Sequence, residues 1–293
     1  MRVFVTGATG LIGSAVTAEL LSAGHSVTAL VRSDASAAKA AASGLDTVRG
    51  GLVDLDVLRT QAAKADGVIH LAFGNDFSSP EALAQNVADE SAALDALGLA
   101  LVGTGKPLVT VSGTPVAAGR PSTESDPLPT DGPVGGRSRS VNRTLALADQ
   151  GVRATAVRLP RTVHNDGTGG FAGLLTQLAR QTGVAGYPGD GTQRWPAVHA
   201  LDAAVLFRLA LENAPGGTAW HAVADEGDAV RDIVTVVGRR LGLPVESLPA
   251  EAFGPLAAIF VVDQPASSAR TRAELGWEPS HPGLLDDLEK IEP

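Results

Sequence analysis

The feature that most constrains the fold is a glycine-rich stretch, TGATGLIG, at residues 6–13. It follows a short β-branched run at 2–6 and opens a segment at 11–24 that has apolar residues at helical spacing and a glycine at its end. A strand, a tight glycine turn and a helix in this order are typical of a dinucleotide-binding unit. Gly7 would permit the turn, Gly10 would let the backbone approach a pyrophosphate, and Gly13 would let helix and strand pack closely.

The turn and the start of this helix hold the first residues that we expect to contact a cofactor. The first helical turn carries free N–H groups and a dipole that favours an anion, so it would face the phosphates of a dinucleotide. The expected contacts here are Thr6, Gly7, Thr9, Gly10, Leu11, Ile12 and Gly13.

The end of the second apolar run indicates which dinucleotide is bound. The sequence there is VTALVRSDAS, with Arg32 and Ser33 where an NAD-binding chain carries an acidic residue for the ribose 2′-hydroxyl. A guanidinium suits a 2′-phosphate, so NADP(H) is favoured over NAD(H). In the alternative, Arg32 is a solvated residue at a strand end and Asp34 binds the hydroxyl. Asp54 is placed either to reach the adenine edge or to cap the next helix.

Apolar strands alternate with helical patterns through the first half of the chain. Strands are expected at 2–6, 26–31, 46–48, 67–73, 107–113 and 154–159, and helices at 11–24, 36–44, 57–65, 80–105 and 138–150. This alternation predicts an α/β fold, a Rossmann-type doubly wound parallel sheet covered on both faces. The rhythm breaks after residue 160, which indicates a smaller, partly interleaved C-terminal substrate lobe. We assign 1–162, with 197–224 returning to it, to the dinucleotide-binding domain, and 163–196 and 225–293 to the lobe.

A segment rich in proline, glycine and acidic residues, at 115–137, separates the fifth strand from the next helix. A loop of this length inside a compact domain is usually a lid or a substrate loop. The alternative is a disordered surface excursion, and the sequence leaves both open.

Composition argues against several classes of function. The chain has 293 residues, no cysteine and a formal net charge of −9. It therefore has no disulfide, thiol nucleophile or thiolate metal site, and we expect no binding of nucleic acid. No cluster of histidines and carboxylates has the spacing of metal ligands, so we expect no metal. The first apolar run is too short for a signal peptide or a membrane span, which favours a cytoplasmic protein without membrane contact, and abundant arginine and alanine beside scarce lysine favour a bacterial source.

Several short motifs occur in an order that matches a known superfamily. They are TGATGLIG at 6–13, the pair Asp54 and Leu55, HLAF at 70–73, VSGT at 111–114, RLPRTVH at 158–164, GDGTQRWPAVHALDAA at 189–204 and SSARTRAELGWEP at 267–279. With these motifs the chain resembles the short-chain dehydrogenase/reductase superfamily, and within it the extended and atypical members of the NAD-dependent epimerase/dehydratase type. The resemblance implies an NAD(P)-dependent oxidoreductase that acts on a small molecule. It also implies cofactor contacts at Leu55, Leu71, Ala72, Pro160 and Val163.

The resemblance further implies a serine or threonine at the end of the fifth strand that binds the reacting oxygen. Thr114 is the match, and Ser112 is the second candidate. The superfamily also carries a Tyr-x-x-x-Lys pair on the next helix, but the only tyrosine of this chain lies far downstream and no lysine occurs between residues 106 and 290. Arg139 and Arg143 stand where the pair should be, on one helical face, where they would stabilise an oxyanion or bind a substrate carboxylate. The alternative is a solvated helix face.

Other candidates for proton transfer come from the second half of the chain. His164 follows a segment that resembles the nicotinamide-contacting turn, so we expect it to face a substrate, and Tyr187 and His199 flank the QRW stretch. A lone histidine in a turn is more often structural. In sugar-nucleotide members of the superfamily an arginine near Arg194 binds a phosphate, and His70 is expected to line the cofactor cleft. The tryptophans at 195 and 220 are expected to be core or lobe contacts.

Three functions fit these residues. The first is an NADPH-dependent reductase of a small carbonyl, enone or imine, with arginines in place of the Tyr/Lys pair. The second is an NADP(H)-binding sensor without turnover, and the third is a non-redox isomerase or cyclase that uses the same cleft. The helices at 80–105 and 138–150 could pair in a homodimer.

Overall fold

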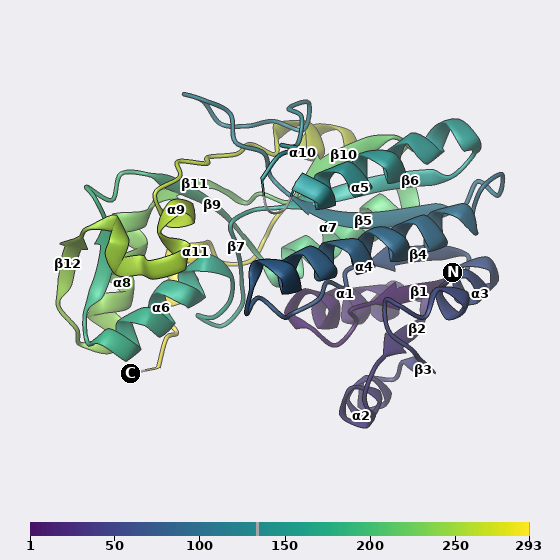
Figure 1. Ribbon diagram of the computed structural model, residues 1–293, viewed down its shortest axis with the longest axis horizontal. Helices are drawn as coiled ribbons and strands as arrows, with labels where there is room; N and C mark the ends of the chain where they lie inside the picture. The colour runs from purple at the N-terminus through teal and green to yellow at the C-terminus, as the bar shows by residue number, and fades with distance from the viewer. Residues whose placement is uncertain (133–134, 293) are drawn as a thin grey trace. The chain divides into compact units, whose positions relative to one another are not determined.

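The computed structural model describes residues 1–132 and 135–292, and Figure 1 shows its course. The chain divides into two compact units. The first consists of Met1–Ser112, Pro127–Arg158 and Ala204–Trp220, and the second of Gly113–Asp126, Leu159–Ala203 and His221–Pro293. Each unit joins segments that are far apart in sequence. That the second unit binds substrate stays a prediction.

The first unit is built on a seven-stranded sheet. Its strand order is β10-β6-β5-β4-β1-β2-β3, with β10 at Thr218–His221, β6 at Arg153–Leu159, β5 at Pro107–Gly113, β4 at Gly67–His70, β1 at Arg2–Thr6, β2 at Ser26–Val31 and β3 at Asp46–Arg49. The pairings of β1 with β2 and β4, of β2 with β3 and of β4 with β5 are parallel. The central strands are buried on both faces, as parallel strands between helical layers must be. This confirms the predicted Rossmann-type doubly wound α/β fold.

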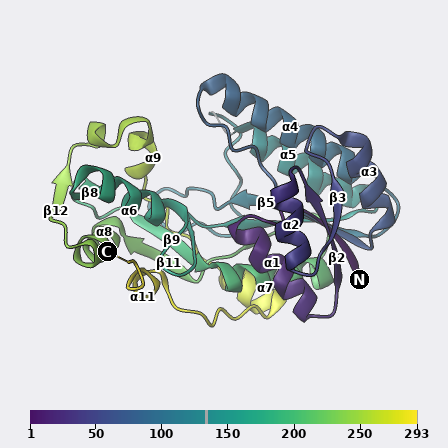
Figure 2. The same ribbon diagram turned by 90° about the horizontal axis from the view of Figure 1, so that it is seen from below.

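Helices cover both faces of this sheet, as Figure 2 shows. They are α1 (Leu11–Ser22), α2 (Asp34–Ala42), α3 (Leu55–Lys64), α4 (Pro80–Leu99), α5 (Gly135–Ala146) with the 3-10 turn η1 (Leu147–Gln150), and α7 (Ala200–Asn213). One core joins α3 and α4 to the sheet through apolar side chains such as Leu58 and Leu97, both 0% exposed. Ser79 caps α4, because its hydroxyl accepts the amide of Ala82 at 3.1 Å and proline occupies the first helical position.

The second unit has a three-stranded and a two-stranded sheet. The larger sheet has the order β11-β9-β7, with β11 at Asp225–Ala229, β9 at Arg194–His199 and β7 at Thr162–His164, and the smaller pairs β12 (Val245–Leu248) with β8 (Ala185–Pro188). The remaining elements are α6 (Gly170–Thr182), α8 (Val230–Leu241), η2 (Ala250–Leu256), α9 (Ala257–Phe260), α10 (Ala269–Leu275) and α11 (Leu284–Leu288). The core between them centres on Trp195 and Phe260, whose ring centroids lie 5.5 Å apart. The expectation that Trp195 is a core residue is confirmed by its full burial.

Several sequence expectations differ from the structure, among them the helix expected at 80–105, which ends at Leu99. The fourth strand ends at His70 rather than at residue 73, so that residues 71–73 leave the sheet. The helix expected from 138 begins at Gly135. The expected loop at 115–137 includes residues 133–134, which lie outside the described part of the chain. Within that loop, Ser122 is tied at both backbone groups to residues 265 and 267 by bonds of 2.9 and 2.8 Å, so the disordered alternative is wrong for this part.

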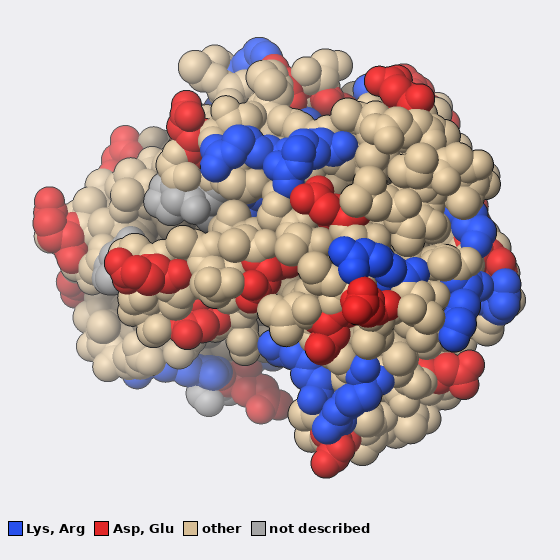
Figure 3. All heavy atoms as spheres, turned by 45° about the vertical axis from the view of Figure 1, so that its right-hand side comes forward, with Lys and Arg blue, Asp and Glu red and all other residues tan. Residues whose placement is uncertain are grey.

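The surface carries charges of both signs. On the face drawn in Figure 3, basic side chains lie in small groups with acidic ones among them. Among the described residues, no helix is both long and apolar enough to cross a membrane.

Candidate functional site

A cavity of about 860 Å³ lies in the first unit where β1, β2 and β4 end. In a doubly wound sheet, ligands bind at this carboxyl edge. Of the expected cofactor residues, seven line the cavity: Gly7, Thr9, Gly10, Arg32, Ser33, Leu71 and Ala72. Sequence reasoning missed other lining residues, among them Ser36, Phe73 and Asn86.

The three glycines of the first turn have separate physical roles. Gly7 has a φ of +74°, and a Cβ there would lie 2.8 Å from the amide nitrogen of Ala72. A Cβ on Gly13 would lie 2.0 Å from the carbonyl oxygen of Gly7, so the close packing expected of this residue is present. A Cβ on Gly10 would meet nothing closer than 3.6 Å, so protein packing does not demand a glycine there. Because Gly10 lines the cavity, its lack of a side chain leaves room for a ligand.

Thr6 and His70 form hydrogen bonds beside this turn. The Oγ1 of Thr6 lies 2.9 Å from the Nδ1 of His70 and accepts the amide of Ala72 at 3.3 Å. Both side chains are fully buried, and neither lines the cavity, so the expectation that His70 does so is wrong. Burial, with the positive charge of Arg137, lowers the pKa of His70 to about 3, so its ring is neutral. The two residues fix the backbone that carries Leu71 and Ala72.

A cation and hydroxyl groups gather where β2 meets α2. Ser33 and Ser36 form a reciprocal cap, with the Ser36 amide donating to the Ser33 hydroxyl at 3.1 Å. Arg32 is exposed and lines the cavity, and no ion pair of the described residues includes it. Asp34, the alternative partner of the ribose, instead pairs with Arg49 at 3.0 Å and does not line the cavity. This corner is therefore suited to an anion.

Asp54 and Leu55 lie beside the cavity rather than on it. Asp54 occupies the cap position of α3, but its side chain makes no cap bond and accepts the amide of Gly51 at 2.7 Å. The carboxylate thus closes the turn that brings Gly51, Leu52 and Val53 to the cavity wall. Contact of Asp54 or Leu55 with an adenine ring stays a prediction.

The arginines of α5 do not meet in one cleft, which corrects the sequence expectation. Arg143 donates to the hydroxyl of Ser91 at 2.7 Å and pairs with Asp95 at 3.4 Å, so its guanidinium lies against α4. Arg139 donates to the backbone carbonyl of Thr130. Neither side chain lines the cavity of the first unit.

A third arginine of this helix, Arg137, contacts a residue of the cavity wall and was missed. It binds both carboxylate oxygens of Glu90, at 2.7 and 2.8 Å, and its guanidinium carbon lies 4.0 Å from the ring centroid of Phe73. Glu90 is only 3% exposed in its side chain, and Phe73 lines the cavity. A glutamate on the buried face of an apolar helix was the available signal, because such a charge needs a partner.

The predicted catalytic hydroxyls end up in different surroundings. Ser112, near the end of β5 in the first unit, has a buried Oγ without a hydrogen-bond partner among the described residues. Thr114, in the second unit, is 5% exposed, and its amide donates to the carbonyl of Leu159 at 3.0 Å. Gln264 donates to the carbonyl of Thr114 at 2.5 Å and lies 3.4 Å from its hydroxyl. Gln264 in turn accepts from Arg161 at 2.6 Å.

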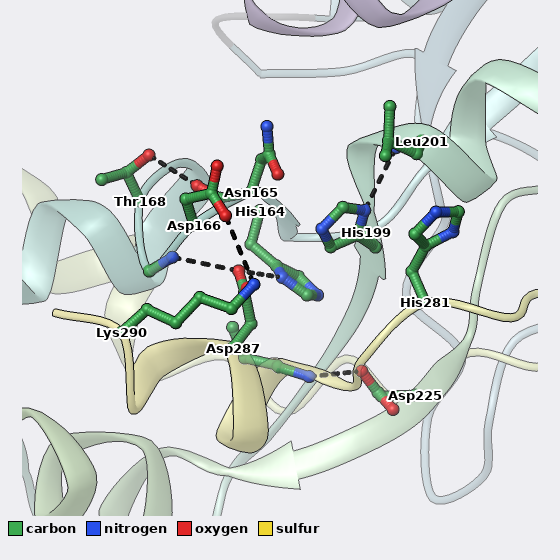
Figure 4. A network of polar contacts seen from close by, with 12 residues as sticks. His164, Asn165, Asp166, Thr168, His199, Leu201, Asp225, His281, Asp287 and Lys290 are labelled. Carbon is green, nitrogen blue, oxygen red and sulfur yellow. Dashed lines mark hydrogen bonds and ion pairs between the residues drawn. The ribbon is translucent and has the colours of Figure 1, made fainter. Parts of the chain in front are cut away.

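His164 belongs to a buried polar network that ties down the C-terminal segment (Figure 4). Its Nδ1 lies 2.8 Å from Asp287, which also accepts the amide of Gly167 at 3.1 Å and pairs with Lys290 at 2.9 Å. Burial alone would raise the pKa of Asp287, but the hydrogen bonds from Lys290 and His164 lower it overall. His164 is 1% exposed, so it does not face solvent or a ligand within this unit, against the sequence expectation.

Two further histidines continue this network. His199 lies edge-on to His164, with ring centroids 5.4 Å apart, and is stacked on His281 at 4.8 Å. His281 binds Asp202 at 2.7 Å, and Figure 4 shows the three rings in a row. Burial, and the neighbouring charges of His164 and His281, lower the pKa of His199. This arrangement holds the chain together, and among the described residues no group of histidines and carboxylates is arranged to hold a metal ion.

The remaining candidates of the second unit are structural where the contacts are known. Tyr187 packs against the core of that unit. Arg194 binds Asp263 through two nitrogens, at 3.1 and 2.9 Å, so its charge is already neutralised. Pro160 and Val163 are buried, and Val163 pairs with Val198 between β7 and β9. Their contact with a cofactor stays a prediction.

Comparison with known proteins agrees with this fold. The model of the NAD-dependent epimerase/dehydratase family matches residues 3–222. An uncharacterised protein of Schizosaccharomyces pombe is 44% identical over 98% of each chain, so the bacterial source is not supported by this relative. A 3-diazoavenalumate denitrifying reductase of Streptomyces is 30% identical over 98% of this chain and 99% of its own. The structure of MoeE5 with UDP-glucose and NAD is 25% identical, with a TM-score of 0.79 over 99% of this chain and 97% of that one.

The match to the family model and the identities of these relatives are sufficient for assignment. The chain belongs to the NAD-dependent epimerase/dehydratase family, whose members are NAD(P)-dependent enzymes of the short-chain dehydrogenase/reductase superfamily.

Proposed function

We propose that the protein is an NADP(H)-dependent oxidoreductase that reduces a small carbonyl, enone or imine. The observation that carries this proposal is the corner of the cavity formed by Arg32, Ser33 and Ser36. The similarity to a reductase over almost the whole chain supports the redox reaction.

The preference for NADP(H) follows from the charges at that corner. A 2′-phosphate is an anion with several acceptor oxygens, and it would be bound by a guanidinium and by hydroxyl groups. Arg32 has no carboxylate partner among the described residues, whereas Asp34 forms an ion pair with Arg49 at 3.0 Å. An acidic residue that would repel the phosphate is thus held away from the cavity lining.

The pyrophosphate would bind at the start of α1. Gly10 is the cap residue of this helix, and the first turn contains no acidic residue. The amides there point along the helix axis with a dipole that favours an anion. The open space beside Gly10 would let the phosphates approach this backbone closely.

The cofactor, when bound, would supply the hydride, solvent would supply the proton that completes the reduced product, and the protein supplies orientation and electrostatics. We assign to Thr114 the role of donating a hydrogen bond to the oxygen that gains charge during reduction. Gln264 lies 3.4 Å from that hydroxyl and can only donate to it through its amide nitrogen, so the Thr114 proton is left for a substrate. Arg139 and Arg143 are not part of this proposal, because their contacts direct them elsewhere.

A fluorescence titration with NADPH and NADH tests the proposal. In an Arg32→Ala variant, NADPH binding should weaken by about 1–3 kcal/mol, the scale of a charge-assisted hydrogen bond, while NADH binding stays unchanged. Arg59→Ala is the matched control, because Arg59 is a surface arginine of α3 outside the cavity lining. An equal loss for both nucleotides, or no loss for either, would contradict the assigned role of Arg32.

Oxidation of NADPH at its absorbance band separates the three functions. A reductase consumes NADPH in the presence of a carbonyl, enone or imine. A sensor binds NADPH and consumes none across the panel. A non-redox enzyme converts its substrate without any change at the nicotinamide band.

A further inference from the structure

The second unit contains a half-buried arginine whose charge no described carboxylate neutralises. Arg161 follows β6 and immediately precedes β7. Its Nε donates to the amide oxygen of Gln264 at 2.6 Å, and its Nη1 donates to the carbonyl of Ile259 at 3.0 Å. Both acceptors are uncharged oxygens, and no ion pair among the described residues includes Arg161.

The surroundings of this guanidinium are aromatic. Its central carbon lies 5.2 Å from the ring centroid of Phe171 and 5.7 Å from that of Trp195. Burial lowers the pKa of Arg161 to about 10, and no carboxylate opposes this shift. The group still carries its charge at neutral pH. Placing a charge in such surroundings without a counter-ion is costly, so the position favours an anion supplied by a ligand.

Arg194, in the same unit, is the internal comparison. It binds Asp263 through Nε and Nη2 and lies at the surface, with 43% of its side chain exposed. Its charge is therefore both hydrated and paired, and it offers little to an anion. Arg161 makes only one Nη bond among the described residues, so the planar Nη edge remains available.

Gln264 links this guanidinium to the hydroxyl proposed to bind the reacting oxygen. An arginine can only donate, so the amide oxygen of Gln264 must face Arg161 and its NH₂ group must face Thr114. The observed contacts have this order, with 2.6 Å on the arginine side and 2.5 Å to the carbonyl of Thr114. One carboxamide thus fixes the positions of Arg161 and Thr114 relative to each other.

We propose that Arg161 binds a carboxylate of the substrate, and that this enzyme reduces carbonyl compounds that carry an acidic group on the same molecule. The inference rests on the proposed reductase function and adds to it the chemical class of the substrate. A carboxylate matches the planar fork of the guanidinium, which lies near the rings of Phe171 and Trp195. In this arrangement Arg161 is a specificity-determining residue, and Gln264 is a positioning residue for Thr114.

The test compares an acid with its neutral ester. The probes are 4-acetylbenzoate and methyl 4-acetylbenzoate, which share the ketone and the ring but differ in charge. Binding to the NADPH-loaded protein is measured by calorimetry at constant ionic strength, and turnover is measured by NADPH oxidation. We expect the acid to bind at least tenfold more tightly than the ester. Equal binding of the two probes, or binding of neither at millimolar concentration, overturns the proposal.

Two variants locate the effect. Arg161→Gln should abolish the preference for the acid, through a higher KM with a smaller change in kcat, and should leave the Kd for NADPH unchanged. Gln264→Glu should abolish the same preference by another route, because it places a carboxylate beside Arg161. Arg194→Gln is the matched control and should keep the preference. The Tm of each variant shows whether the fold is retained.

The outcomes separate the two levels of the argument. If the acid preference persists in Arg161→Gln, the carboxylate site is wrong while the reductase function stands. If NADPH does not bind to the unmodified protein, the proposed function itself fails. Inorganic phosphate is tested as a competitor. If the site binds any anion, phosphate at equal concentration would displace the acid, and this result would contradict a carboxylate-specific fork.

Discussion

The buried carboxylate of Asp287 should determine much of the stability of the second unit. It accepts from His164 at 2.8 Å and from the amide of Gly167 at 3.1 Å, and it pairs with Lys290 at 2.9 Å, while its own side chain is 0% exposed. Asp287→Asn keeps the shape but replaces one oxygen by an NH₂ group. The amide oxygen can stay with His164 and Gly167, so the NH₂ group then faces Lys290.

The magnitude follows from these contacts. Charge-assisted hydrogen bonds are roughly twice as strong as neutral ones, so weakening the bonds from His164 and Gly167 costs about 1–2 kcal/mol. Loss of the pair with the half-exposed Lys290 adds about 1 kcal/mol or less. We therefore expect Asp287→Asn to lower the free energy of unfolding by about 2–3 kcal/mol. Asp166→Asn is the control, because Asp166 is an exposed partner of the same lysine and its loss should cost about 0.5 kcal/mol or less.

The same network gives the stability a dependence on pH whose sign can be derived. The folded pKa of Asp287 is lowered from 3.8, so its contribution is present above that pH and is lost as the pH falls through the folded pKa. The folded pKa of His199 is lowered from 6.5, so the folded state prefers the neutral ring and loses stability as the pH falls below 6.5. Both groups act in the same direction, and stability should decline in acid in two stages. Asp287→Asn should remove the stage at lower pH. The stage below pH 6.5 should persist and become larger, because the negative charge of Asp287 raises the pKa of His199.

Urea denaturation followed by tryptophan fluorescence, at several pH values between 3 and 8, measures both effects. The variant and its Asp166→Asn control are compared at unchanged m-value. A loss in Asp287→Asn that is no larger than in the control would refute the reasoning, because the carboxylate would then be dispensable. An acid limb identical to that of the unmodified protein would refute the assignment of the lower stage to Asp287.

Three other perturbations test the first unit and the proposed chemistry. Gly13→Ala should lower the free energy of unfolding by about 1–3 kcal/mol and weaken NADPH binding, because the new Cβ would lie 2.0 Å from the carbonyl oxygen of Gly7. Urea denaturation and the fluorescence titration measure the two effects. Unchanged values would show that the backbone of the turn shifts at little cost. Glu90→Gln should cost about 1–3 kcal/mol in unfolding free energy, since it leaves the guanidinium of Arg137 without its buried partner, and a cost near zero would show that the pair is solvated. Thr114→Ala should reduce the rate of NADPH oxidation by about 10²–10³-fold while NADPH binding is retained, the scale of losing one oxyanion donor, and a normal rate would exclude the assigned role.

Local sequence signals predicted the first unit well because they act over short distances. The glycine triplet lies within a single turn, so the requirement for close packing at Gly13 and for room at Gly10 could be inferred from spacing alone. The position of Arg32 and Ser33 at the cavity could also be inferred locally, because the two residues lie between a strand and a helix that Ser33 caps. Alternating apolar strands and helices gave the sheet, because a buried parallel strand needs a continuous apolar run.

Partner choice between distant residues could not be predicted in this way. The resemblance led us to expect Arg143 where the family carries a lysine, yet its guanidinium binds Ser91 and Asp95, some fifty positions earlier in the sequence. His164 follows a motif that suggests substrate contact, but its hydrogen-bond partner Asp287 lies 123 positions later in the sequence. The partner of a polar side chain is the group that the folded chain places beside it. The sequence indicates that a charge is present, and only the fold shows which group neutralises it.

Arginine serves both the fold and the two proposed ligand sites. Arg137 and Arg194 each bind a carboxylate of their own unit with two nitrogens, and they stabilise structure. Within the described part of the chain, Arg32 and Arg161 form no such pair. Arg32 lines the cavity together with Ser33, and Arg161 is linked to a hydroxyl group through Gln264. A ligand anion would supply the counter-charge in each case, a phosphate for the first and a carboxylate for the second. Arg32→Ala should lose the preference for NADPH, and Arg161→Gln should lose the preference for the acid. If both do, arginines that pair with a protein carboxylate are structural in this fold, and arginines without such a pair bind ligands.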